Sequence, residues 1–356
     1  FQIVRYSGEQ VRNPLRQRRR RVLSNLAPFT RGSALALAVV IWHTADPGSA
    51  TALAHRLSEE LEEGDALILR DVSDGAELDP VVAHHSTIEH VGGSGGEADT
   101  VLVVAADIAP EPSLVSGMRR GAKEFDAWTG VLLDPPGGAV AAAGFDLAFT
   151  GRTSPSRSGL SIERLPETVF LSAAVPGELF AVRRQTIDEL GALGAATTPA
   201  GVALDLSLRL RASGARAGVM PGARGRLPNW QPREAGIEDR FPSVVRSYPG
   251  PILAVTGPAL ALTGPAEITR GLLAGDGREA IGSYKAGLLA AREAASERST
   301  LGALRALDAA TFSDGLGSAG PGMSLPTRAL AGAWWGATSS VMRARRARHR
   351  RQAARS

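Results

Sequence analysis

The residue types that could do chemistry gather in a few short segments of the sequence. His84, His85, Glu89 and His90 offer imidazole and carboxylate ligands to a metal ion. Their spacing matches no standard metal site, so ordinary surface histidines explain them better. The glycine-rich residues 92–96 suggest a phosphate-binding loop, but they lack the Lys and the Ser or Thr of such a loop and precede an apolar run. A flexible connector is the better interpretation of that segment.

Three other polar residues stand at or near the ends of apolar runs. His43, Asp71 and Asp107 each come shortly after a stretch that is typical of a buried strand. The roles of these residues as ligand contacts are implied by a family resemblance that other segments of the chain carry. For Asp107, an aspartate that caps a helix or closes a loop is an equally good interpretation.

The composition excludes several classes of function. The 356 residues include no Cys, which excludes disulfide scaffolds, thiol catalysis, iron–sulfur clusters and Cys-based zinc sites. Hydrophobic residues make up 44% and charged residues 21%, which is typical of a globular chain. The formal net charge of +4 is small for this length, and no nucleic-acid-binding module is visible. No unbroken run of 18 apolar residues is present, so we expect no transmembrane helix.

Strand-like and helix-like segments alternate along the first half of the chain. The expected strands are Ala34–Trp42, Ala66–Leu69, Val101–Val104 and Val131–Leu133, and the expected helices cover 50–63 and a segment after Pro112. This alternation predicts an α/β fold with a mostly parallel sheet flanked by helices.

Changes in composition divide the chain into four parts. We expect a basic N-terminal segment over 1–33, an α/β domain over 34–228, a linker rich in Pro, Gly and Arg over 229–264, and a helical C-terminal region with a basic tail over 265–356. The last part includes a predicted final helix over Thr327–Arg348.

Three segments carry a resemblance to a known family. Residues 128–144 (WTGVLLDPPGGAVAAAG), 175–191 and 205–214 (DLSLRLRASG) are similar, in order and spacing, to three motifs of the family 2 glycosyltransferases. The resemblance covers roughly residues 35–225. It implies a GT-A fold that binds a nucleotide-diphosphate sugar at the carboxyl edge of its sheet. A D-x-D motif of that family holds Mg²⁺ or Mn²⁺ on the diphosphate, and an E-D motif supplies a general base.

Both acidic motifs are degenerate in this chain. The D-x-D position falls on Ala105–Asp107, so Asp107 alone remains as the implied metal ligand. The E-D position falls on Val202 and Ala203, neither of which can take a proton, so no catalytic base is assigned. Over residues 202–211 around it, Val or Leu occupies every second position, and this period of two is typical of a strand. The family has a helix there, and we favour the helix.

The resemblance also implies contacts to the donor. Segment 69–75 corresponds to the family's uridine-contacting segment, although it is one residue short. The implied nucleotide-binding residues are Asp71, Ser73 and Asp74, with His43 near them; a polar turn is the alternative. Arg183 and Arg184 match family positions and are expected to be mainly structural, with a contact to the diphosphate as the alternative. Asp205 is also expected to be structural.

The basic C-terminus suggests a partner. Several Arg residues follow Trp334 and Trp335, and tryptophan beside clustered arginine suits an interfacial helix on anionic lipid. A packed helix with a solvated basic end is the alternative.

The resemblance implies a sugar transferase of cell-envelope polysaccharide synthesis. Its donor would be a nucleotide-diphosphate sugar and its acceptor a saccharide or a lipid-linked saccharide. The expected location is cytoplasmic, peripheral at the inner face of the plasma membrane. The alternative is a catalytically silent GT-A scaffold that binds a glycan or a protein.

Overall fold

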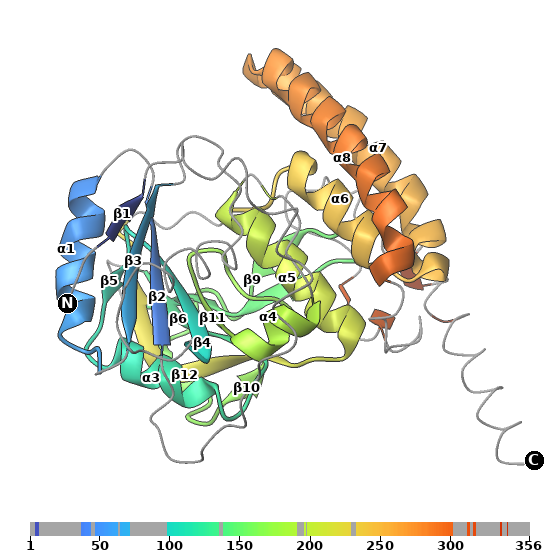
Figure 1. The fold of residues 1–356 in the computed structure, drawn as a ribbon. Coiled ribbons are helices and arrows are strands. Elements are labelled where there is room, and N and C mark those ends of the chain that lie inside the picture. Colours follow the sequence, from blue (N-terminus) through green and yellow to red (C-terminus); the bar gives the residue numbers. More distant parts are fainter. Residues whose placement is uncertain are drawn as a thin grey trace, which may run out of the picture.

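The computed structural model describes residues 4–6, 37–43, 47–62, 65–71, 98–134, 138–190, 196, 198–228, 233–301, 312–313, 316–317, 335–336 and 340. The strands are β1 Val4–Tyr6, β2 Leu37–His43, β3 Ala66–Asp71, β4 Thr100–Ala105, β5 Ala109–Pro110, β6 Ala127–Leu133, β7 Val140–Ala143, β8 Phe145–Leu147, β9 Thr153–Pro155, β10 Phe170–Leu171, β11 Leu179–Arg183 and β12 Ala217–Arg226. The helices are α1 Pro47–Ser58, α3 Leu114–Gly121, α4 Arg184–Leu190, α5 Pro199–Ser213, α6 Ile237–Ser247, α7 Gly250–Ala274 and α8 Gly277–Leu301. The fold is therefore mixed α/β with helices beyond the sheet, as expected (Figure 1).

The main sheet brings the ends of its central strands to one edge. Its order is β1-β3-β2-β4-β11-β6-β12-β10, with β5 added on β12 and β7 on β6. The pairs β1–β3, β3–β2, β2–β4 and β6–β12 are parallel. Strand β11 runs antiparallel to both β4 and β6. The carboxyl ends of β3, β2, β4, β6 and β12 and the amino end of β11 therefore lie along the same edge.

Helices cover the sheet on both faces. In β2, Val39 and Ile41 belong to one hydrophobic cluster with residues of α1 and α3. The alternate residues Val40 and Trp42 belong to a second cluster with residues of α4 and α5. Because both faces are covered, the strands form continuous apolar runs, and this is why the sequence showed them.

Helix α5 explains the period of two over 202–211. Val202 and Leu206 lie in the cluster beneath the sheet, whereas Leu204 and Leu208 lie in the cluster with α6 and α7. Each set repeats every four residues, as on a helix face. Two interleaved buried faces produce an alternation that imitates a strand, and the helix is confirmed.

Two local expectations are wrong. Residues 4–6 lie in the basic N-terminal segment, where no strand was expected, and form the edge strand β1 beside β3. The expected linker over 229–264 contains all of α6 and the start of α7. The prolines predicted a linker because proline usually interrupts helices. Pro249 and Pro251 stand at the start of α7, where a helix tolerates proline, whereas Pro242 and Pro258 lie inside α6 and α7. The division of the chain into domains otherwise remains a prediction.

Helices α6, α7 and α8 pack on one another beside the sheet domain, and the α7–α8 hairpin projects away from it (Figure 1). By length and composition alone, α7 could cross a membrane. The search for an unbroken apolar run missed it because Thr, Gly and Pro interrupt its apolar residues. The predicted final helix over 327–348 lies almost wholly outside the described residues.

Trp335 does not serve as an interfacial anchor. Its ring is 5% exposed and stacks on Phe149, with ring centroids 5.0 Å apart and planes 7° apart. Its Nε1 donates a hydrogen bond to the carbonyl of Leu316 at 3.3 Å. This part of the C-terminal region is therefore packed inside the protein, while the Arg-rich tail lies outside the described residues.

Candidate functional site

Three of the residues singled out in the sequence lie at the carboxyl edge of the sheet. His43 and Asp71 are direct neighbours, at the ends of the paired strands β2 and β3. Trp42 pairs with Ala105 at the end of β4, two residues before Asp107. These three residues therefore share one edge of the sheet. Ser73 and Asp74 lie outside the described residues.

Asp107 lies in a tight turn after β4. The turn is closed by a hydrogen bond from the Ile108 N–H to the carbonyl of Ala105 at 3.1 Å. The next helix, α3, has Ser113 as its N-cap, so helix capping does not explain Asp107. The carboxylate is about half exposed, and its Oδ2 lies 3.3 Å from Nη2 of Arg233. Asp107 is therefore a solvent-accessible acid held beside a cation.

Glu178 is the acid at this edge that sequence reasoning missed. It directly precedes β11, and its carbonyl accepts a hydrogen bond from the Ala105 N–H at 2.7 Å. The residue is only 4% exposed. Burial raises the pKa of its carboxyl group from 4.5 to about 7, against the lowering effects of a hydrogen bond from its own backbone N–H and of the Arg233 charge. The Asp107 charge also raises this pKa, so these three side chains are close enough to influence one another.

The loop that carries Glu178 is pressed against the first turn of α5. A Cβ on Gly177 would lie 2.7 Å from backbone atoms of Pro199 and Ala200, so only glycine fits there. The turn is fixed by Thr198, whose Oγ1 accepts from the Gly201 N–H at 3.0 Å and donates to Oδ2 of Asp239 at 2.7 Å. Glu178 therefore lies beside the amino end of α5.

The amino-terminal half of α5 carries no acid at the expected base position. Val202 and Ala203 are buried. Asp205 is buried too, and its carboxylate is 2.8 Å from Nε of Arg209 and 3.2 Å from Nη1 of Arg246. Asp205 thus fastens α6 to α5, in line with the structural role that we expected.

The structure places Arg183 and Arg184 away from the edge that holds Asp107. Arg183 pairs with Thr100 at the amino end of β4, because β11 is antiparallel. Asp107 follows the carboxyl end of that strand, so the two arginines belong to the opposite edge of the sheet. Nε of Arg184 lies 3.6 Å from Asp188 of its own helix.

Two other arginines stand at the ligand edge. Arg233 contacts Asp107, as described, and Arg226 is the last residue of β12, paired in register with Leu133. The Arg226 side chain is half exposed, and its Nη2 lies 2.7 Å from Glu111. No sequence signal singled out Arg233, because it falls in the segment expected to be a linker.

The fit of this edge to a metal ion is limited. The described residues contain no group of three or more His, Cys, Asp or Glu side chains that could hold one. Among the described residues beyond the carboxyl end of β4, Asp107 offers an exposed carboxylate. Mg²⁺ is often held by one or two carboxylates together with substrate phosphates and water. The site suits a metal that arrives with a phosphorylated ligand, and it does not suit a closed protein cage.

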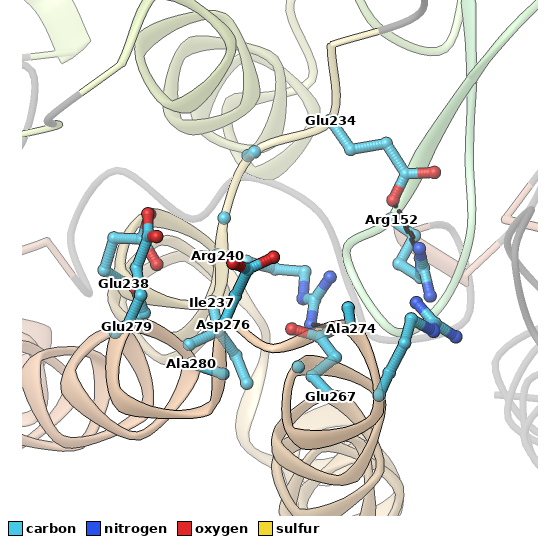
Figure 2. Close-up of a pocket in the computed structure, with 15 residues that line it drawn as sticks. Arg152, Glu234, Ile237, Glu238, Arg240, Glu267, Ala274, Asp276, Glu279 and Ala280 are labelled. Carbon is cyan, nitrogen blue, oxygen red and sulfur yellow. Dashed lines mark hydrogen bonds and ion pairs between the residues drawn. The ribbon is translucent and has the colours of Figure 1, made fainter.

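A cavity of about 480 Å³ lies between the β8–β9 loop and helices α6, α7 and α8. Figure 2 shows Glu238 and Glu279 at one side of the view, Arg152 at the other, and Arg240 with Glu267 between them. Among the lining residues, Nη2 of Arg152 lies 2.7 Å from Glu234. Glu234 directly follows the residue that contacts Asp107, so the cavity adjoins the sheet edge.

Neither family models nor curated proteins match this sequence. Among solved structures, the chain is similar to GalNAc-T7, crystallised with UDP, GalNAc and Mn²⁺, at 13% identity and a TM-score of 0.39, over 64% of this chain and 51% of that one. This chain therefore spans about half the length of GalNAc-T7. It is also similar to the mannosyltransferase PcManGT from Pyrobaculum calidifontis, in complex with GDP-Man and Mn²⁺, at 14% identity and a TM-score of 0.34, over 86% of each chain. A197 from STIV is similar at 7% identity and a TM-score of 0.33, over 55% of this chain and 96% of that one. Similarity at this level carries no conclusion about activity.

Proposed function

We propose that the chain binds a nucleotide-diphosphate sugar at the carboxyl edge of its sheet and transfers the sugar to a saccharide. The observation that carries the proposal is the group formed by Asp107, Glu178 and Arg233, at the edge that also holds Asp71 and His43. The group combines the exposed acid Asp107, the buried acid Glu178 and the exposed cation Arg233. The motif resemblance in the sequence points to the same edge.

The donor's diphosphate would lie beside Asp107. Mg²⁺ or Mn²⁺ bound by this carboxylate and the phosphates would neutralise the charge that develops on the leaving nucleoside diphosphate. Arg226 and Arg233 stand at the same edge and can contact phosphate oxygens directly. Asp71 and His43 are the proposed contacts to the nucleoside, together with Ser73 and Asp74, which remain predictions.

Glu178 is the carboxylate that we infer to replace the missing E-D base. Its loop packs on the turn of α5 that immediately precedes Val202 and Ala203, where the family's acid is expected. In the transfer, its carboxylate takes the proton of the acceptor hydroxyl while that oxygen bonds to the anomeric carbon. The bond from this carbon to the phosphate oxygen breaks, and the nucleoside diphosphate leaves with the electron pair.

The cavity of Figure 2 is the proposed acceptor site. Its lining of guanidinium and carboxylate groups offers donors and acceptors to the hydroxyl groups of a saccharide. The consecutive residues Arg233 and Glu234 connect it to the donor edge, since the first contacts Asp107 and the second contacts Arg152. An acceptor longer than one sugar could therefore reach from the cavity to the donor.

The cellular role follows the resemblance and stays a proposal. We propose that the acceptor is a saccharide or a lipid-linked saccharide of the cell envelope, and that the protein works at the cytoplasmic face of the plasma membrane. The Arg-rich tail would add attraction to anionic lipid there.

Calorimetry with a panel of UDP-, GDP- and dTDP-sugars, with and without Mn²⁺, tests the donor site. One nucleotide sugar should bind in a metal-dependent way, and Asp107→Ala should abolish this binding. Glu178→Gln should keep donor binding and lose transfer to an oligosaccharide acceptor. Asp146→Asn, at an exposed position on β8, is the matched control and should change neither.

The second candidate is a catalytically silent scaffold that binds a glycan or a protein partner. It is favoured by Val202 and Ala203 at the expected base position and by the single acid of the D-x-D position. Absence of binding to every nucleotide sugar would support the scaffold and refute the donor site. Donor binding without transfer, in wild type and in Glu178→Gln alike, would support a silent protein that kept its pocket.

A further inference from the structure

The exposed large apolar side chains of this protein concentrate on one hairpin. Among the described residues, five of the seven lie on α7 and α8. Leu272 and Leu273, at the end of α7, are 61% and 85% exposed. In Figure 1 this end of the hairpin projects away from the sheet domain. An exposed apolar surface on a helix pair indicates a binding face.

The outward face of α7 is apolar over its first four turns and again at its end. Exposed positions recur every three or four residues from Pro251 through Ala254, Pro258 and Ala261 to Pro265, and all carry small apolar side chains. Thr269 and Arg270 are exposed between these positions and the exposed leucines Leu272 and Leu273. No Asp, Glu, Lys or Arg occurs between Gly250 and Ala266. Surface helices ordinarily turn charged residues to water on this side.

The opposite face of α7 already has its partners. Ile252, Thr256 and Leu260 are buried toward the rest of the protein, and Gly264 lies against the ring of Tyr284 in α8. Only 29% of the most apolar 18-residue window of this helix is buried. The described residues therefore cover one side of α7 and leave an apolar side without cover.

The chemistry of the uncovered face favours lipid over protein. Protein interfaces draw their affinity from aromatic, Met and Arg anchors seated in pockets. The outward face of α7 offers prolines, alanines and leucines in their place. Arg270 and Arg278, together with the exposed acids Asp276 and Glu279, flank the leucine-bearing tip. There these charged groups can meet lipid headgroups while the apolar side chains meet acyl chains.

The hairpin cannot cross the membrane as it stands. Helix α8 packs along α7 and carries charged residues over its whole length. Near its far end, Glu297 pairs with Arg246 at 3.0 Å, and Arg298 donates to the carbonyl of Tyr248 at 2.9 Å. Crossing would take these charges into hydrocarbon, at a large cost.

We propose that the outward face of α7, with Leu272 and Leu273, lies in the plane of a membrane and contacts its acyl chains. This inference does not depend on nucleotide-sugar transfer, since it stands on the uncovered face alone. About 25 residues of helix, roughly 37 Å long, would rest on the lipid. This contact differs from attraction through the Arg-rich tail, because it needs no anionic lipid.

Flotation of the full chain with vesicles tests the proposal. The vesicles are phosphatidylcholine alone and phosphatidylcholine mixed with phosphatidylglycerol, each at low and high salt. Wild type should float with both at high salt. Ala254→Glu/Ala261→Glu should weaken binding to phosphatidylcholine by about tenfold or more. The reason is that the free energy needed to place a charge against acyl chains exceeds the free energy of a tenfold change in affinity. The control Ala295→Glu/Ser296→Glu adds the same charge to an exposed part of α8 and should float like wild type.

Circular dichroism and thermal melting establish that both variants are folded, since all four positions are exposed. Equal flotation of wild type and Ala254→Glu/Ala261→Glu would overturn the proposal, as would wild type that floats only with the anionic vesicles at low salt. A third outcome is that wild type does not float but forms dimers in sedimentation, and that Ala254→Glu/Ala261→Glu abolishes these dimers. That outcome would overturn the lipid contact and assign the face to a second copy of the chain. Donor binding by calorimetry is scored separately, so failure of one proposal leaves the other standing.

Discussion

Glu178→Gln should remove part of the pH dependence of the free energy of unfolding. In the folded chain, burial raises the pKa of this carboxyl group from 4.5 to about 7. Below pH 4.5 the group is protonated in both the folded and the unfolded chain. Between these two values the folded chain holds a proton that the unfolded chain has released, so the free energy of unfolding falls as pH rises.

The size of the effect follows from the two pKa values. A pKa change of one is worth about 1.4 kcal/mol, so a rise of about 2.5 (from 4.5 to about 7) corresponds to about 3 kcal/mol. Wild type should lose about this much stability between pH 4 and pH 8 through this group alone. Glu178→Gln cannot ionise and lacks this loss. The free energy of unfolding of the variant, minus that of wild type, should therefore rise by about 3 kcal/mol over the same range.

Urea unfolding of both proteins at a series of pH values, followed by circular dichroism, measures this difference. Comparison of variant with wild type at each pH cancels the titration of the other groups. Glu59→Gln removes an exposed carboxylate of the same type and serves as the control. A difference between Glu178→Gln and wild type that stays constant from pH 4 to pH 8 would refute the view that Glu178 is held in its uncharged form by burial.

Three further changes have expected outcomes. Asp205→Asn should lower the free energy of unfolding by about 3–5 kcal/mol, because it leaves two buried arginines without their shared charge; urea unfolding measures this. Gly177→Ala should cost about 1–3 kcal/mol, because its methyl group meets the first turn of α5; a normal melting temperature would contradict the packing. Arg233→Ala should weaken nucleotide-sugar binding by about tenfold in calorimetry, as expected for loss of a hydrogen bond to a charged group. Arg184→Ala, at the opposite edge of the sheet, should leave that binding unchanged.

Much of the sheet could be predicted from the sequence, for a physical reason. Strands buried on both faces are continuous apolar runs, so β2, β3, β4 and β6 stood out. Helix α6 and the part of α7 before Pro265 did not, because prolines in both, with arginines in α6 and glycines in α7, obscured their pattern. In α6 the apolar residues Ile237, Phe241 and Val244 follow helical spacing, and this signal was available in a segment that composition assigned to a linker.

The candidate site could be predicted only in part. The resemblance singled out Asp71 and Asp107, and both follow strands of the parallel part of the sheet, so they lie at its carboxyl edge. Glu178 precedes a strand and reaches the same edge only because β11 runs backwards between β4 and β6. Apolar patterning carries no information on strand direction, so it could not distinguish Glu178 from Arg183 at the other end of that strand.

Helix α5 also bears on how the chain can change in evolution. Residues 201–210 are all buried, because the sheet occupies one side of the helix and α6 and α7 the other. Most helices have a solvent face on which neutral substitutions accumulate, and this stretch has none. Its variation should therefore be restricted to coordinated exchanges of similar volume with both neighbouring layers. The outward face of α7 can drift among apolar residues without any matching change inside the protein.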